Sequence, residues 1–120
     1  MKILIVEDDR VLSLMLSRMV QRIGHRVVDS VTMGESAIDI VENNSVDLIL
    51  MDIMLEGQID GIETMEKIRT HSDVPVIYVT GNSDYSTIER AEQTNFVAYL
   101  VKPIAFDQLK KSIAEMNNSG

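Results

Sequence analysis

Acidic side chains follow two short, largely apolar runs of this chain. Glu7, Asp8 and Asp9 come directly after the first run, and Asp52 comes directly after the second, at 46–51. Short runs of this kind are typical of strands that are covered on both faces, and such strands belong to parallel sheets. Ligands of an open parallel sheet bind just beyond the carboxyl ends of its strands. We therefore expect these carboxylates to meet at one edge of a sheet.

A group of carboxylates at adjacent strand ends is a hard, oxygen-rich site of the kind that suits Mg²⁺. Helix capping is the other interpretation of three consecutive acids, because acids are favoured at the start of a helix. One acid would satisfy a cap, so the run Glu7–Asp9 favours metal binding. Asp52, Thr80 and Lys102 each end an expected strand, and none of them is a specific signal by itself.

Apolar spacing along the chain predicts an alternation of strands and helices. The strands are expected at 3–6, 26–31, 46–52, 75–79 and 97–101, and the helices at 10–23, 34–43, 61–71, 83–94 and 106–116. The strand 26–31 is β-branched and partly polar, which suits a sheet edge. Gly24 is expected to end the first helix. This alternation predicts right-handed βαβ units and a doubly wound α/β sheet.

Length and composition limit the class of protein. A chain of 120 residues forms one domain, expected at 1–116, with a polar and frayed tail at 117–120. The net charge of −8 argues against a nucleic-acid surface. The sequence has no cysteine, which excludes disulfide, thiol and Cys-zinc chemistry. Because no apolar stretch approaches the roughly 20 residues of a membrane span, we expect a cytoplasmic protein without membrane contact.

Taken together, the motifs resemble those of the receiver domain of two-component response regulators, from Lys2 to about Ala114. The matching segments are Val6-Glu7-Asp8-Asp9, Met51-Asp52-Ile53-Met54, Asp60-Gly61, Pro75-Val76-Ile77, Thr80-Gly81 and Tyr99-Leu100-Val101-Lys102-Pro103. They stand in the order of that family and at close to its intervals, so the joint match is highly specific. The resemblance implies a flavodoxin-like fold, a five-stranded parallel sheet of order 2-1-3-4-5 with five helices.

The resemblance implies a signalling domain rather than an enzyme. Asp52 would accept a phosphoryl group from the phosphohistidine of a sensor histidine kinase or a phosphotransfer protein. Asp8 would ligate Mg²⁺ directly, together with Asp52 and the backbone carbonyl of Met54, and Glu7 would act through water. Asp9 lies outside this set and is expected to cap the first helix.

Three further residues have implied roles in binding and switching. Lys102 would pair with one phosphoryl oxygen, and the Thr80 hydroxyl would hydrogen-bond another. Tyr99 would turn inward as Thr80 moves, which switches the surface around the fourth helix, the fifth strand and the fifth helix. The resemblance implies a downstream target as a partner. Whether the domain also forms a homodimer when it is phosphorylated is left as an open alternative. The Lys102–Pro103 peptide is a candidate cis bond, since proline follows.

The sequence departs from the family pattern at two places. Glu56 replaces the usual proline, and the interval from Asp52 to Asp60 is one residue longer, with the extra residue expected within 56–59. Asn95 and Phe96 replace the usual Gly-Ala before the fifth strand. Asparagine tolerates the left-handed conformation, so Asn95 can still close the fourth helix.

Three other functions fit the fold class less well. A flavodoxin-like electron carrier would have to bind the flavin phosphate beside Glu7–Asp9, which would repel it, so we discard this interpretation. A Mg²⁺-dependent phosphohydrolase commonly has a second Asp two residues after its nucleophile, and Met54 stands there. A phosphorylation-independent docking module with the receiver fold is the remaining alternative. The intact set of acids, Thr80 and Lys102 argues against it.

Overall fold

The structure is a computed structural model that describes residues 1–118, and it contains one parallel five-stranded sheet of order β2-β1-β3-β4-β5. The strands are β1 (Lys2–Val6), β2 (Arg26–Val31), β3 (Leu48–Met51), β4 (Val76–Thr80) and β5 (Ala98–Val101). The helices are α1 (Arg10–Ile23), α2 (Gly34–Asn43), α3 (Gly61–Ile68), α4 (Tyr85–Glu92) and α5 (Phe106–Asn118). The predicted fold class and strand order are confirmed.

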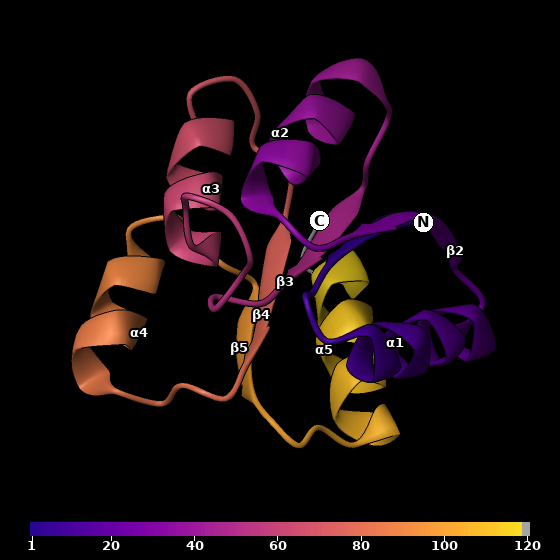
Figure 1. Cartoon of the computed structure of the whole chain (residues 1–120). Coiled ribbons are helices and arrows are strands. Elements are labelled where there is room, and N and C mark those ends of the chain that lie inside the picture. Colours follow the sequence, from indigo (N-terminus) through magenta and orange to yellow (C-terminus); the bar gives the residue numbers. More distant parts are fainter. Residues whose placement is uncertain (119–120) are drawn as a thin grey trace.

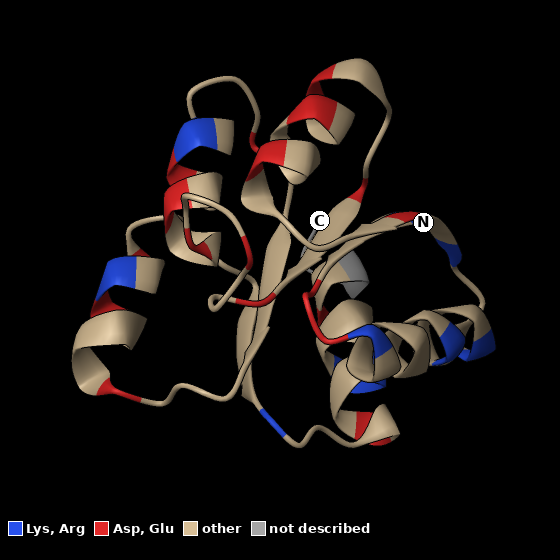
Figure 2. Ribbon diagram, viewed as in Figure 1, with Lys and Arg blue, Asp and Glu red and all other residues tan. Residues whose placement is uncertain are grey.

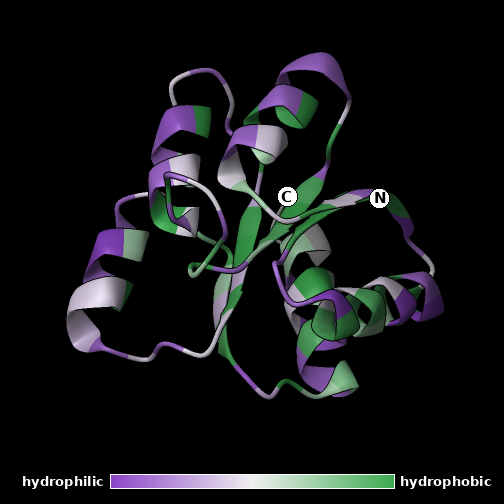
Figure 3. Cartoon of the chain, in the orientation of Figure 1, coloured by the Kyte–Doolittle hydropathy of each residue, from purple (hydrophilic) through white to green (hydrophobic). Residues whose placement is uncertain are grey.

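Helices cover both faces of the sheet, with α1 and α5 on one side and α2, α3 and α4 on the other (Figure 1). Successive strand residues point to opposite faces, so Ile3 and Ile5 pack toward α1 and α5, whereas Leu4 and Val6 pack toward α2 and α3. Every residue of β3 and β4 is buried, and Figure 3 shows these central strands as mostly apolar ribbon. The edge strand β2 is only half-buried, as its polar residues predict.

The register of the sheet places the expected site residues side by side. Val6 pairs with Met51, so Glu7 and Asp52 follow neighbouring positions, and the Asp52 amide donates to the Val6 carbonyl at 2.9 Å. On the other side of β3, the Lys102 amide donates to the Thr80 carbonyl, also at 2.9 Å. The four strand ends therefore open at one edge of the sheet.

Two helices are shorter than their apolar patterns predict. α3 ends at Ile68 rather than His71, and the amides of Thr70 and His71 bond to carbonyls three residues back, as in a turn. The Arg69 side chain donates to the carbonyls of Val74 and Thr94. α4 covers Tyr85–Glu92 rather than 83–94. Before the helix, a turn at 82–84 replaces the predicted helical residues. After it, the amides of residues 93–95 each bond to the carbonyl three residues back, which is a tighter turn than an α-helix.

The last helix is longer than predicted. α5 continues to Asn118, so two residues of the expected polar tail are helical. The other two residues of that tail, 119–120, lie outside the described part of the chain. None of the helices within residues 1–118 combines the length and the apolar character that crossing a membrane requires.

Two backbone predictions, for Gly24 and for the Lys102–Pro103 peptide, are confirmed, and the prediction for Asn95 is confirmed only in its conformation. Gly24 has φ 107° and ends α1, and its amide donates to the carbonyl of Gln21. Asn95 has φ 56°, in the left-handed region, although α4 itself ends three residues earlier. The Lys102–Pro103 peptide is cis.

The loop with the extra residue, between β3 and α3, rests on the start of α2. Glu56 forms an isolated parallel bridge with Met33, and the Gln58 amide donates to Glu35 Oε2 at 3.4 Å. This loop is thus held against the neighbouring helix α2. The departures from the family pattern, at 56–59, come after Asp52 and Met54 in the chain.

Candidate functional site

Three carboxyl groups meet beyond the ends of β1 and β3. Ligand atoms of Glu7, Asp8 and Asp52 all lie within 4.8 Å of one another. Glu7 is 1% exposed and Asp52 is 4% exposed, while Asp8 is half-buried. Figure 2 shows that acidic segments follow β1 and β3, and these acids line an open pocket of about 650 Å³. The strand ends thus bring together the acids that the sequence singled out.

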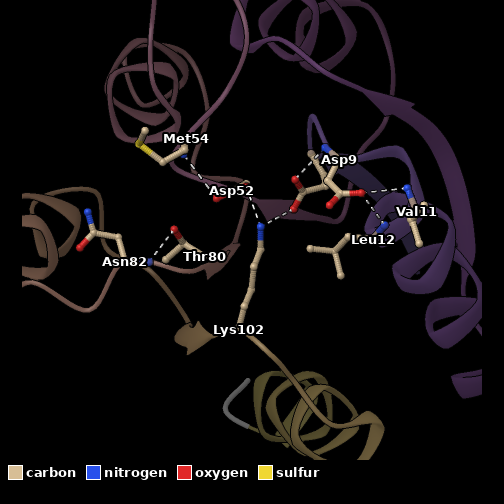
Figure 4. Close-up of polar contacts among 9 residues, drawn as sticks. Asp9, Val11, Leu12, Asp52, Met54, Thr80, Asn82 and Lys102 are labelled. Atoms are coloured by element: carbon tan, nitrogen blue, oxygen red, sulfur yellow. Dashed lines mark hydrogen bonds and ion pairs between the residues drawn. The ribbon is translucent and has the colours of Figure 1, made fainter.

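Lys102 reaches this group of acids from the end of β5 (Figure 4). Its Nζ donates to Asp52 Oδ2 at 2.8 Å. It also lies 2.9 Å from Glu7 Oε1, an ion pair whose angles do not make a hydrogen bond. Burial lowers the pKa of Lys102, but the contacts with Asp52 and Glu7 outweigh burial and raise it. The ammonium therefore stays charged and neutralises part of the cluster.

Glu7 is the most buried acid of the group, and burial raises its pKa to about 7. A hydrogen bond from the Asp9 amide to Oε2, 3.0 Å long, opposes this rise, as does Lys102. The negative charge of Asp52 adds to it. Among the described residues Glu7 Oε1 has no hydrogen-bond partner. Oε1 lies 2.9 Å from the Lys102 ammonium, but three carboxyl groups share that one positive charge, and an oxygen-rich site of this kind fits a divalent cation such as Mg²⁺.

Asp52 is held in a fixed position by its surroundings. The Met54 amide lies 3.3 Å from Oδ1 as a donor, and Lys102 occupies Oδ2. Gly61, the first residue of α3, lies so close that a Cβ there would be 2.1 Å from the Asp52 carbonyl oxygen. This contact explains why a glycine follows Asp60, and it fixes the loop that leaves the site.

Thr80 and Tyr99 lie behind the loop between β4 and α4. Thr80 is fully buried, and its Oγ1 accepts a hydrogen bond from the Asn82 amide at 3.3 Å. The Tyr99 hydroxyl donates to the Asn82 carbonyl at 2.6 Å, while the ring packs against those of Tyr78 and Phe96. Both residues thus contact the same backbone segment.

Comparison with known proteins gives the family of this chain. A family model described as the response regulator receiver domain matches residues 3–114. The chain belongs to this family of receiver domains. The transcriptional regulatory protein PdtaR of Mycobacterium tuberculosis is 30% identical over 93% of this chain and 54% of that protein. The uncharacterized transcriptional regulatory protein YrkP of Bacillus subtilis is 37% identical over 90% and 46%. This chain spans about half the length of these curated relatives.

Solved receiver structures have the same fold as this domain. One is the signal receiver domain of a modulated diguanylate cyclase from Desulfovibrio desulfuricans, with a TM-score of 0.90 and 34% identity. It aligns with 98% of this chain and 94% of that one. Another is a CheY-like receiver domain protein from Methanospirillum hungatei, with a TM-score of 0.89, 26% identity and the same two coverages. The predicted membership of the family is confirmed.

The structure separates the predicted receiver residues into two groups. Glu7, Asp8, Asp52, Met54 and Lys102 line the pocket. Thr80 and Tyr99 do not line it, and hydrogen bonds to Asn82 connect both of them to the loop that follows β4.

The three consecutive acids after β1 have different contacts. Asp9 Oδ1 accepts hydrogen bonds from the amides of Val11 and Leu12, which makes Asp9 the cap of α1. Glu7 and Asp8 instead lie in the cluster with Asp52. The two interpretations of the acidic run therefore apply to different members of it.

Two contacts made by the loop and helix that follow β4 were not predicted from the sequence. Asn82 Oδ1 accepts the Asp84 amide at 2.8 Å, and the pattern Asn-x-Asp before a helix is a local signal for such a turn. Arg90 of α4 forms an ion pair with Asp60 at 3.2 Å. Thirty residues separate that pair, so no local pattern predicts it.

Proposed function

We propose that residues 1–116 act as a phosphoacceptor domain in which Asp52 takes a phosphoryl group from a sensor histidine kinase or a phosphotransfer protein. The observation that carries this proposal is the environment of Asp52. Its carboxylate is almost fully buried, yet it lines an open pocket, and Lys102 and the Met54 amide hold its two oxygens. A nucleophile held in this way has a fixed direction of attack.

The proposed transfer needs a nucleophile and neutralising charge. An Asp52 oxygen would form the bond to phosphorus while the bond between phosphorus and the donor histidine nitrogen breaks and its electron pair returns to that nitrogen. A donor whose other ring nitrogen carries a proton then leaves as neutral imidazole, and Asp52 becomes an acyl phosphate. Transfer of this kind depends on positioning and on neutralisation of the phosphoryl oxygens. Lys102 would donate to one phosphoryl oxygen, and it would have to give up part of its contact with Asp52 to do so.

A divalent cation is the second source of positive charge in this proposal. Three carboxyl groups face one ammonium in the cluster, and this excess of negative charge would repel an incoming phosphoryl group. Mg²⁺ would be held by Asp8 and Asp52, by Glu7 through water, and by the backbone carbonyl of Met54, as the family resemblance implies. When bound, it would supply charge that neutralises the acids and the phosphoryl oxygens.

The output would be a change in the surface around α4, β5 and α5. Thr80 would turn its hydroxyl to a phosphoryl oxygen, and Tyr99 would respond through the loop to which both are bonded. Large apolar side chains are exposed on this surface at Tyr85, Val97 and Val101. A downstream target, or a second copy of the chain, would bind there once the domain is phosphorylated.

Intact-mass spectrometry tests the phosphoacceptor role. The protein is incubated with acetyl phosphate and Mg²⁺, and we expect one phosphoryl adduct on wild type and none on Asp52→Asn. Asp47→Asn, at an acid outside the pocket, is the matched control and should be labelled like wild type. An adduct on Asp52→Asn equal to that of wild type would refute the assignment. A wild type that stays unlabelled with Mg²⁺ present would favour the phosphorylation-independent docking module.

A further inference from the structure

The start of α4 is held by a side chain outside the helix. The residue that precedes the helix, Asp84, makes no capping hydrogen bond with its own side chain in the described structure. Its amide instead donates to Asn82 Oδ1 at 2.8 Å. Because a backbone amide is only a donor, the atom that faces it must be the carboxamide oxygen, which fixes the orientation of Asn82.

Asn82 is bonded to three different parts of the domain. Its amide donates to Thr80 Oγ1, its carbonyl accepts from the Tyr99 hydroxyl, and its side chain accepts from Asp84. Asn82 and Met54 line the pocket from the loops that follow β4 and β3, and Figure 4 shows both side chains. One residue thus joins the buried threonine, the half-buried tyrosine and the first turn of α4.

The three hydrogen bonds of Asn82 differ in length. The bond to Thr80 is 3.3 Å long, beyond the usual 2.9–3.0 Å for an N–H···O pair. The bonds to Tyr99 and Asp84 are 2.6 and 2.8 Å long. When the Thr80 hydroxyl turns to a phosphoryl oxygen, Oγ1 moves away from the Asn82 amide, so this bond is the one that the movement itself would release. Asn82 then stays bonded to Tyr99 and Asp84.

The other end of α4 is anchored in the core. The Tyr78 hydroxyl and Thr94 Oγ1 are 2.7 Å apart, and Thr94 Oγ1 donates to the Ala91 carbonyl at 2.6 Å. Arg69 Nε donates to the Thr94 carbonyl at 2.8 Å. Tyr78, Thr94 and Ala91 are all fully buried, so this end resists displacement. A displacement of α4 would therefore be confined to its first turn.

We propose that Asn82 is a positioning residue, whose side chain passes a change at Thr80 to the first turn of α4 while the last turn stays fixed. This inference rests on the proposed phosphoacceptor function, because it concerns the response of α4 to a bound phosphoryl group. Asn82 could instead serve only as a cap that stabilises α4. The cap alone would make the helix more stable without making it respond to Thr80.

Amide chemical shifts with beryllofluoride and Mg²⁺, a mimic of the phosphoryl group, separate these two roles. In wild type we expect shift changes at Asp52 and Lys102, through 80–84 and over 85–88, with much smaller changes at 91–94. In Asn82→Ala at saturating beryllofluoride, the changes over 85–88 should fall at least threefold while those at Asp52 persist. Asn82→Ser retains an oxygen acceptor for the Asp84 amide and should restore the response.

A matched control and three contrary outcomes complete the experiment. Ser83→Ala, at the adjacent exposed residue that lines the same pocket, should respond like wild type. Changes over 85–88 that are as large in Asn82→Ala as in wild type would show a cap only and overturn the inference. Changes at 91–94 as large as those at 85–88 in wild type would overturn the fixed last turn. No shift changes at Asp52 in wild type would overturn the proposed function, and this inference with it.

Discussion

α1 and α4 both follow strands that carry site residues, but they are held in different ways. α1 has 14 residues, begins at the Asp9 cap and ends at Gly24. Leu16 and Val20 are fully buried in the core, and half-buried apolar residues flank them. This side of the pocket carries Glu7 and Asp8, so the acids are attached to a firmly packed element.

α4 has 8 residues, and in the described structure Ala91 is its one fully buried residue. Its half-buried Ile88 belongs to neither core cluster. A helix with so few buried contacts opens and shifts at low cost in free energy. From this difference we expect a fixed side of the pocket, with Glu7 and Asp8, that would bind a cation, and a movable side, with Asn82, that would respond.

The largest expected effect is on stability, from truncation of one apolar residue in each helix. Leu16→Ala should reduce the free energy of unfolding by about 2–5 kcal/mol, because it leaves a cavity in the core. Ile88→Ala should cost less than half as much, since the side chain is only half-buried. Urea unfolding of both variants, with unchanged m-values, measures the two costs. Equal costs would mean that α4 is packed as firmly as α1.

Addition of Mg²⁺ tests the fixed side of the pocket. A cation that binds only the folded state at ten times its dissociation constant adds about 1.4 kcal/mol to the free energy of unfolding. We expect Mg²⁺ to raise the melting temperature relative to EDTA, and we expect Asp8→Ala to lose most of this rise. A rise of the same size in Asp8→Ala would place the cation elsewhere. Glu115→Ala, at an exposed acid far along the chain, is the control.

Tyr78→Phe compares the two ends of α4. The variant loses the hydrogen bond to Thr94 but keeps the ring, and Thr94 still donates to the Ala91 carbonyl. We expect a loss of about 1 kcal/mol. Native-state hydrogen exchange should become faster at 91–95 and change less over 85–88. An equal increase along the whole helix would show that the buried bond does not anchor one end.

The smallest expected effect comes from the exposed ion pair that ties α4 to the start of α3. The Arg90 side chain is 51% exposed, so Arg90→Ala should cost less than about 1 kcal/mol and even less at high salt. Asp60→Ala should cost more, because the Asp60 side chain also accepts the Glu63 amide in a capping box. Urea unfolding at two salt concentrations measures both variants. A cost for Arg90→Ala equal to that of Asp60→Ala would make the ion pair a main support of α4.

Local patterns in the sequence determined the elements and their order. The apolar runs of β1, β3 and β4, the helical spacing of α1 and the glycine at its end each depend on neighbours along the chain. The placement of Glu7, Asp8 and Asp52 at one sheet edge could also be predicted, because parallel strands end together. The ends of α3, α4 and α5 were predicted less well. Just past the end of α3, the Arg69 side chain donates to the Thr94 carbonyl 25 positions away, and a local pattern does not contain such a contact.

Only the tertiary structure decided how the site residues are oriented. It pairs Lys102 with Asp52 and Glu7, and it turns Thr80 and Tyr99 toward the backbone of Asn82 rather than into the pocket. These contacts join residues that come from different strands and loops. Their partners depend on sheet register, on rotamer and on the burial that the whole domain imposes. Residue types and strand ends could therefore predict which groups meet, but the direction of each donor and acceptor is set by the packed fold.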